Sequence, residues 1–436
     1  MPLNVHPECK ARLLQTLTTA IAQLYVENGK FISRSDALPA LELPEKVLPG
    51  KGELRSQLSL YIDNDRPLTE FILDTLSEEL SHLPFDDVAR QRLTELDGYN
   101  ESALVAQRLL NALIDLPRQY TLSFKLPTEL STMLGDQSVV VISPRLRLVR
   151  VTDEIISQYP PSKSETSQVG ALSGLLGGLN GWLSAVHWQM DGIYLQVDAQ
   201  GFIGPYGGSQ PHLEAIRALR AFSGLGLALG LFEVSSDYLP QSPPSDILLH
   251  RQDAGGEFVA VRTISLDDGI SRTIKRLRLS GFIDLLGDPK RRSQFVTSTF
   301  FLIQAALSGG KKADLIFLAS QWFFDGHSHG SDQLLKFVQT MIVLEILLGD
   351  KASSDQTGLN VLLRNRCAYL IGTSQEDRAE VLEWFRKIYD VRSEIVHTGK
   401  HALSTSELEL FARLRWICRR VIRKEIELLR ADQGKG

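Results

Sequence analysis

Cysteine is scarce in this chain, with three among 436 residues. Cys9, Cys367 and Cys418 lie far apart and are odd in number, so they support neither a disulfide framework nor a CxxC metal site. Disulfide bonds are typical of oxidising compartments, whereas thiols persist in a reducing cytoplasm. We therefore expect a cytoplasmic protein.

Long apolar runs are also missing. No stretch approaches the roughly 18 uninterrupted apolar residues that mark a membrane span. The N-terminus, Met-Pro-Leu-Asn-Val-His, lacks a basic head followed by an apolar run. The most apolar segment, residues 170–183, is broken by five glycines and by Asn180. We interpret that segment as a connector, and we expect no membrane partner.

Neither sign of charge dominates. The net charge is −5 and the isoelectric point is near 6.0, which argues against a protein covered with basic residues for nucleic-acid binding. Any contact with RNA is therefore expected to use a local basic patch. The contents of 43% hydrophobic and 23% charged residues are those of a globular protein.

The common catalytic motifs are absent from the first two thirds of the chain. Its glycine-containing strings match neither a Walker loop, which needs Lys-Ser or Lys-Thr, nor a dinucleotide fingerprint. No G-x-S-x-G elbow and no HExxH pair occur in this part of the chain. We expect no cofactor, and we expect any chemistry to lie in the last third.

The chain length predicts two or three folded units. Apolar residues at helical spacing predict helices at 8–30, 68–80 and 100–116. Pro39, Pro44 and Pro49 predict a loop between the first two. Residues 1–118 are therefore expected to form a mainly helical region.

The pattern changes near Tyr120, where short stretches become rich in β-branched residues or alternate in polarity. These stretches predict strands at 120–124, 138–143, 146–151, 193–197, 258–264 and 273–279. A strong helix is predicted at 210–232, and a loop is predicted around Pro240, Pro243 and Pro244. Residues 119–285 are thus expected to form a mixed α/β domain.

Beyond residue 285 the pattern is helical. Helices are predicted at 293–306, 331–348, 358–370, 374–397 and 404–429. Ser374-x-x-Asp377 resembles a capping box, and Ser404-x-x-Glu407 matches one. Short connections between such helices predict a bundle over 290–436. The expected fold class is α+β, with a mixed N-terminal region followed by an all-α C-terminal bundle.

Arg392 and His397 stand out near the end of one predicted helix. Residues five apart differ by roughly 140° around an α-helix, so the two side chains do not share a face. Gly399 is placed to end the helix as a left-handed cap, which puts His397 in the last turn. The helix dipole favours imidazolium there. A permanent cation and a titratable imidazole are what metal-free RNA cleavage requires.

Glu345 is the third candidate. It is the only acid within the apolar run 341–348, so its carboxylate is expected to be buried and to need a partner. Arg392 is the natural partner. RNA cleavage by the 2′-hydroxyl needs a base and an acid at once, and a single His397 cannot be both. A two-fold dimer in which two copies of helix 374–397 meet would supply two imidazoles and two guanidinium groups.

Residues 389–397, Tyr-x-x-Arg-Ser-x-Ile-Val-His, resemble the active-site signature of the HEPN superfamily, whose defining element is an Arg separated from a His by four to six residues. The resemblance covers about the last third of the chain and is greatest to the Apea-like branch, in which a Glu recurs in the helix that corresponds to 331–348. Further matching segments are 322–325, 362–372 and 376–378.

This resemblance implies a metal-independent endoribonuclease with a composite site at a homodimer or higher homo-oligomer. Arg392, His397 and Glu345 would be catalytic, and Tyr389, Ser393, Arg366 and Arg378 would support them or contact RNA. Similar proteins occur in bacterial toxin–antitoxin and anti-phage defence systems, where a large N-terminal region commonly gates the nuclease. The implied partners are RNA and a phage-derived or antitoxin trigger.

Other interpretations of the same residues remain open. The bundle would be a non-catalytic dimerisation or RNA-binding module if Arg392 only bridges Glu345, with function residing in the N-terminal region. Asp325, His327 and His329 allow a metal-dependent enzyme, or else form a polar loop. Basic residues also recur in the last helix, either as a solvated face or as a track for an RNA backbone; they are Arg413, Arg415, Arg419, Arg420, Arg423, Lys424 and Arg430.

Overall fold

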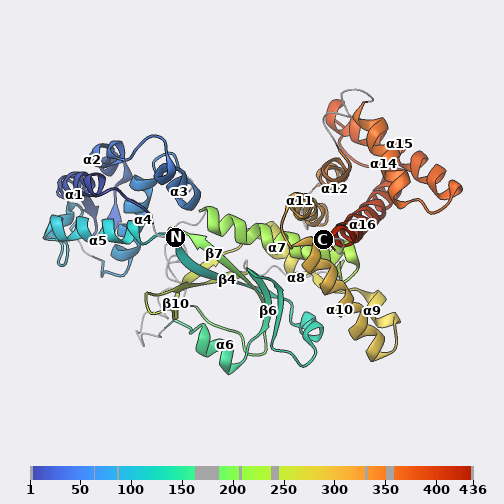
Figure 1. Cartoon of the computed structure of the whole chain (residues 1–436), viewed down its shortest axis with the longest axis horizontal. Coiled ribbons are helices and arrows are strands. Elements are labelled where there is room, and N and C mark those ends of the chain that lie inside the picture. Colours follow the sequence, from blue (N-terminus) through green and yellow to red (C-terminus); the bar gives the residue numbers. More distant parts are fainter. Residues whose placement is uncertain are drawn as a thin grey trace.

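A computed structural model describes residues 3–62, 64–85, 88–162, 186–205, 209–236, 245–328, 332–349 and 358–433. The predicted fold class is confirmed: the protein is α+β, with its sheets in the first two thirds and an all-α C-terminal part (Figure 1). Among the described helices, none is both long and apolar enough to cross a membrane.

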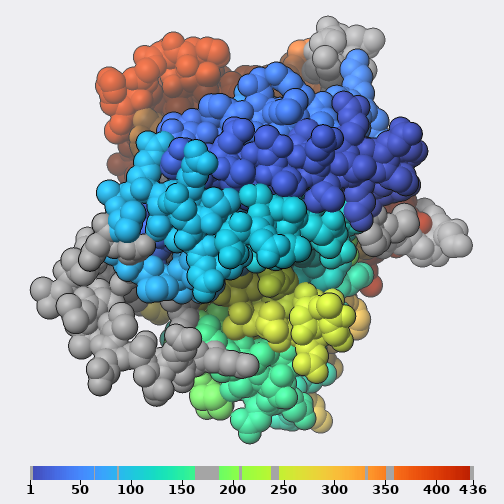
Figure 2. Space-filling model, turned by 90° about the vertical axis from the view of Figure 1, so that its left-hand side faces the viewer, coloured from blue at the N-terminus to red at the C-terminus, as the bar shows by residue number. Residues whose placement is uncertain are grey.

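The N-terminal unit consists of five helices and a small three-stranded sheet with its own apolar core, which includes Leu17, Phe71 and Leu109. Figure 2 shows this unit lying over the middle of the molecule, next to strand β10. Its elements are α1 (Pro7–Ile21), β1 (Tyr25–Glu27), β2 (Phe31–Ile32), α2 (Arg34–Val47), α3 (Glu53–Ile62), α4 (Pro67–Ser81), β3 (Gln91–Arg92), η1 (Leu93–Glu95) and α5 (Ser102–Ile114).

Two predictions for this unit are wrong. The helix predicted at 8–30 ends at Ile21, because Asn28 and Gly29 adopt positive φ values of 51° and 71° and form the turn of the β1–β2 hairpin. The proline-rich loop is instead helix α2, which contains Pro39 and Pro44. Pro44 is buried where α2 packs between α1 and α4, so tertiary packing offsets the poor helix propensity of proline.

The middle of the chain forms a six-stranded antiparallel sheet in the order β10-β9-β4-β7-β6-β5. Side chains alternate across it: Leu122 and Phe124 face the helices, whereas the buried Thr121 and Ser123 lie on the opposite face. Its strands and flanking elements are β4 (Arg118–Leu126), η2 (Thr128–Leu134), β5 (Val139–Ser143), β6 (Leu146–Arg150), α6 (Asp153–Gln158), β7 (Ile193–Gly201), β9 (Asp246–Gln252) and β10 (Phe258–Ser265).

Most of the predicted strands are present, with three differences. Strand β9 was not predicted. The strand expected at 273–279 is divided between helix α8 (Asp268–Lys275) and the short strand β11 (Leu277–Leu279). The helix begins there because the Asp267 side chain accepts a hydrogen bond from Ile270 N. The helix at 210–232 ends earlier, as α7 (Gln210–Leu229), and is followed by β8 (Phe232–Val234). The predicted connector at 170–183 and the loop at Pro240 lie outside the described residues.

The C-terminal part contains the five predicted helices with shifted ends, and in addition α9 and α11, which were not predicted. They are α9 (Gly281–Leu285), α10 (Pro289–Ala306), α11 (Lys311–Asp325), α12 (Gln333–Leu348), α14 (Leu359–Ile371), α15 (Gln375–His397) and α16 (Thr405–Gln433). Helix α7 packs along α11 so closely that a Cβ atom on Gly224 would overlap the Ser320 backbone. One apolar core therefore continues from the sheet through α7 into the bundle.

A buried charged cluster joins the N-terminal unit to the sheet. Asp74 of α4 lies 3.5 Å from the Arg34 guanidinium, and Glu78 lies 3.6 Å from Arg262 of β10. Arg262 also donates to Gly204 O. Burial, helped by the nearby Glu70 carboxylate and opposed by Arg34, raises the pKa of Asp74 to about 7. The folded protein therefore holds this carboxyl group partly protonated near neutral pH.

We expect Asp74→Asn to remove a pH-dependent loss of stability. Because the pKa of Asp74 is raised in the folded state, its contribution to stability is greatest below about pH 4 and is lost as the pH rises towards 7. Between pH 5 and pH 8 the free energy of unfolding of the wild type should fall by on the order of 2–4 kcal/mol relative to that of the variant. Urea unfolding at both pH values measures this difference, and parallel pH dependence in the two proteins would contradict it.

Candidate functional site

Helix α15 carries Arg392 and His397, and the residues at its two ends determine where it begins and stops. At its start, Ser374 Oγ accepts a hydrogen bond from Asp377 N at 3.1 Å, but the Asp377 carboxylate binds Thr373, so the capping box is incomplete. At its end, His397 is the last helical residue and Gly399 has φ +69°, the left-handed conformation that was predicted. The intact helix therefore presents His397 in its final turn.

The turn after α15 is held by Lys400, a residue that sequence reasoning missed. Its Nζ atom lies 2.8 Å from Glu394 Oε2 and 2.6 Å from Glu407 Oε1, which joins the end of α15 to the start of α16. Hydrogen bonds to Glu394 and Glu407 raise the pKa of Lys400. The Ser404–Glu407 capping box is confirmed, and Glu407 thus serves as both cap and ion-pair partner.

Arg392 and Glu345 form the predicted ion pair, between α15 and α12. Arg392 Nη2 lies 3.3 Å from Glu345 Oε1, and the two side chains are 24% and 23% exposed. Glu345 is therefore only partly buried, contrary to expectation. Arg392 Nε is shielded from water and has no hydrogen-bond partner among the described residues. Glu345 Oε1 also has no hydrogen-bond partner among the described residues, so the pair is an ionic contact that leaves hydrogen-bonding capacity on both side chains.

Tyr389 and Ser393 lie beside this ion pair. The Arg392 guanidinium is 6.0 Å from the centre of the Tyr389 ring, within the outer range of a cation–π contact. Ser393 follows Arg392 on the helix and is half-buried. Tyr389 therefore lies close to the Arg392 guanidinium, and Ser393 is its neighbour in the chain.

His397 lies apart from these residues. It is exposed, and within the described part of the chain it has no hydrogen bond or ion pair. Because α15 remains helical through His397, the imidazole projects roughly 140° around the axis from Arg392. The neighbouring Val396 is 47% exposed. One chain therefore does not bring His397 and Arg392 together.

Several arginines near the site bind the ends of helices. Arg366 Nη1 donates to Leu348 O of α12 at 2.9 Å, and Arg378 lies 5.4 Å from the centre of the Tyr369 ring. Three arginines of α16 likewise donate hydrogen bonds to backbone carbonyls at the C-terminal ends of other helices. Arg415 donates to Gly326 O of α11, Arg420 to Ile371 O of α14 and Arg423 to Leu229 O of α7. Cations are favourable at the negative end of a helix dipole, so these side chains are structural in part.

Two of the three residues of the alternative metal site have other partners. Asp325 pairs with Arg220 of α7, and His327 Nδ1 lies 2.8 Å from Phe323 O. Burial and the nearby Arg415 lower the pKa of His327 to about 3. His329 lies outside the described residues. In the part of the chain that the structure describes, no three His, Cys, Asp or Glu side chains converge as a metal site would require.

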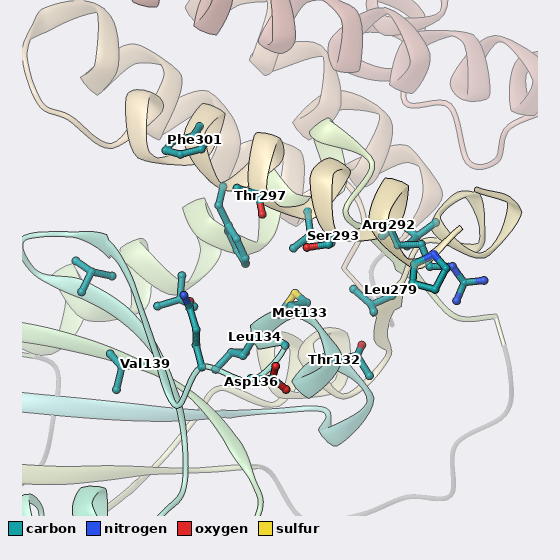
Figure 3. Close-up of a pocket in the computed structure, with 18 of the residues that line it drawn as sticks. Thr132, Met133, Leu134, Asp136, Val139, Leu279, Arg292, Ser293, Thr297 and Phe301 are labelled. Atoms are coloured by element: carbon teal, nitrogen blue, oxygen red, sulfur yellow. The ribbon is translucent and has the colours of Figure 1, made fainter. Parts of the chain in front are cut away.

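A cavity of about 1080 Å³ lies elsewhere, between η2, β5 and α10 (Figure 3). Val139 of the edge strand β5 and Phe301 of α10 line it together with Asp136 and Arg292. Neither Glu345, Arg392 nor His397 contributes to its walls. Its walls are both polar and apolar, and two of its charged lining residues, Asp284 and Arg292, lie 3.6 Å apart as an ion pair.

Comparisons of this chain with protein-family models, with curated proteins and with solved structures find no match.

Proposed function

We propose that the C-terminal helices form a HEPN-type, metal-independent endoribonuclease that acts as a homodimer. The observation that carries the proposal is the Glu345–Arg392 ion pair, formed between two helices at the position expected from the resemblance. The same helix exposes His397 in a last turn that Gly399 and Lys400 define. A fixed guanidinium and an exposed imidazole are the groups that RNA transesterification needs.

The proposed reaction uses the 2′-hydroxyl of RNA as the nucleophile. One His397 takes the proton from this hydroxyl, and the resulting oxygen attacks the adjacent phosphorus. Arg392 hydrogen-bonds the pentacovalent phosphate. The bond from phosphorus to O5′ then breaks, and a second, protonated His397 donates a proton to O5′. The products are a 2′,3′-cyclic phosphate and a 5′-hydroxyl end.

A second copy of the chain supplies the second imidazole in this scheme. His397 projects away from Arg392 of its own chain, so two copies of α15 related by a two-fold axis are needed to surround one phosphate. The exposed Val396 beside His397 offers an apolar contact for that pairing. The N-terminal and middle regions would then serve as the sensing or regulatory part, responding to a phage-derived or antitoxin trigger in a cytoplasmic defence or toxin system.

The divergence of Arg392 and His397 within one chain also supports a second candidate. The bundle would then be a non-catalytic dimerisation or RNA-binding module, in which Glu345 neutralises Arg392 and the N-terminal region carries the function. The two candidates differ in one measurable respect, because only the first cleaves a phosphodiester bond.

Cleavage of a generic single-stranded RNA in EDTA tests the proposal. The wild-type protein is expected to produce 2′,3′-cyclic phosphate ends, with a rate per chain that increases with protein concentration until the dimer is saturated. An RNA with 2′-O-methyl groups at every position is the matched control and should remain intact, because it lacks the nucleophile. Cleavage of the methylated RNA, or loss of all activity in EDTA, would contradict the mechanism.

A further inference from the structure

The middle of α16 carries an unusual excess of positive charge. Residues 410–424 contain six Arg or Lys residues and no acid. Arg415 is used in the contact with Gly326 described above, and Arg413 lies 4.5 Å from the centre of the Trp384 ring. Lys424 pairs with Glu427 at 2.7 Å. The remaining three cations, Arg419, Arg420 and Arg423, line one pocket.

This pocket has a volume of about 320 Å³ and lies between α16, the end of α7 and the α9–α10 region. Gly230, which ends α7 in the left-handed conformation, and Ser280 form its small-residue wall. Trp416, Phe282 and Phe295 form its aromatic wall. The cavity is therefore both basic and aromatic, and it is separate from the residues of the proposed catalytic site.

The positive charge of the pocket is incompletely neutralised. Arg420 and Arg423 each use one nitrogen to bind a helix-end carbonyl and keep their other N–H groups. Arg419 has no hydrogen bond or ion pair within the described residues, although it reaches solvent. Desolvation lowers the pKa of Arg419, and the Glu233 carboxylate opposes this effect only in part. An anion in the pocket would be favourable to all three guanidinium groups.

The aromatic wall adds a second kind of recognition. Phe282 is 53% exposed and packs edge-on against Phe295, with ring centres 5.7 Å apart. Arg420 already lies over Trp416, 4.7 Å from the centre of its ring. The open face of Phe282 is therefore the surface available to a planar group. Arginines that bind phosphate beside aromatic rings that stack on bases are the usual means of binding single-stranded nucleic acid.

We propose that this pocket binds one nucleotide unit, with its phosphate on Arg419 and Arg423 and its base against Phe282. The unit belongs either to a single-stranded RNA or to a free nucleotide. Arg419 lies 14 residues along α16 from its first residue, Thr405, which corresponds to about 21 Å. The pocket thus lies well away from the turn that presents His397. If the nucleotide unit belongs to RNA, the pocket holds the strand at a distance from the proposed cleavage site. In that case the inference rests on the proposed function.

Fluorescence anisotropy with a labelled 12-nucleotide single-stranded RNA tests this site in the full-length chain. A His397→Ala background is used so that the RNA stays intact. Arg419→Gln is expected to weaken binding at least about tenfold, and Phe282→Ala about fivefold. Lys424→Gln is the matched control, because Lys424 lies five residues from Arg419, faces away and already pairs with Glu427. It should change binding less than about twofold.

Competition by adenosine monophosphate and by inorganic phosphate separates the two sources. Displacement of the RNA by the mononucleotide at concentrations comparable to its own dissociation constant identifies a free-nucleotide site, whereas resistance to displacement identifies the RNA strand as the ligand. The inference would be overturned if wild type, Arg419→Gln and Phe282→Ala bound the labelled RNA with equal affinity and also bound adenosine monophosphate with equal affinity. Loss of binding in Arg419→Gln without any cleavage by the wild type would retain this site and reject the ribonuclease.

Discussion

Replacing His397 by alanine is expected to abolish metal-independent RNA cleavage, with a loss of about 10³-fold or more in the single-turnover rate. The reason is that both copies of the imidazole are removed at once, so the 2′-hydroxyl loses its base and O5′ loses its acid. Because His397 is exposed and lacks contacts among the described residues, the variant should unfold at the same temperature as the wild type. Cleavage at saturating RNA in EDTA provides the measurement.

His401 provides the matched control for this substitution. It is an exposed histidine four residues later, in the turn between α15 and α16. His401→Ala removes the same chemical group from nearly the same place and is expected to retain activity within about twofold. Cleavage by His397→Ala at the wild-type rate would show that the RNA chemistry, if present, resides elsewhere. Equal losses in both variants would point to a structural role for the turn.

Replacing Arg392 by glutamine is expected to reduce cleavage by about 10²–10³-fold at saturating RNA. The substitution removes the cation that binds the pentacovalent phosphate, and it also leaves Glu345 without its partner. Arg392→Lys keeps the charge but loses the planar, bidentate geometry, so an intermediate rate is expected. Arg386→Gln is the control, because Arg386 lies on the same helix, is 51% exposed and pairs with Glu383.

Glu345 should act through Arg392. Glu345→Gln preserves the shape of the side chain and is expected to slow cleavage about tenfold by releasing the guanidinium. The double variant Glu345→Gln with Arg392→Gln should be no slower than Arg392→Gln alone, because the two residues form one unit. Additive losses would indicate that Glu345 contacts RNA or transfers a proton itself. Thermal unfolding of each variant identifies any loss that comes from breaking the partly buried ion pair.

Local signals predicted five of the seven described C-terminal helices. The Ser404–Glu407 box and Gly399 act within one turn of the chain, so their geometry follows from nearby residues alone. The Glu345–Arg392 pair was also predicted, although the Glu345 carboxylate is less buried than a lone acid in an apolar run suggests. The turn at Asn28 and Gly29 also follows from a local signal, because an Asn-Gly pair favours the positive φ values that end the first strand of the hairpin.

Other features depend on which distant segments meet. Pro44 is tolerated within α2 because neighbouring helices bury it. Lys400 joins Glu394 to Glu407 only once α15 and α16 are brought together by the turn between them. The arginines of α16 looked like a continuous basic face, but three of them reach carbonyls at the ends of α7, α11 and α14. Which carbonyl an arginine reaches is set by helix packing, and residue spacing carries no information about it.

Short-range chemistry along the chain thus suffices to place α15, its final turn and the residue types of the candidate site. Tertiary packing decided the rest, for physical reasons that no local pattern contains. It directs Arg392 towards α12 while the unbroken helix turns His397 to solvent, which is why the proposed reaction calls for a second copy of the chain. It also makes α7 part of the bundle core, and it brings Gly230 and Phe282 from distant segments next to Arg419 of α16 in one pocket.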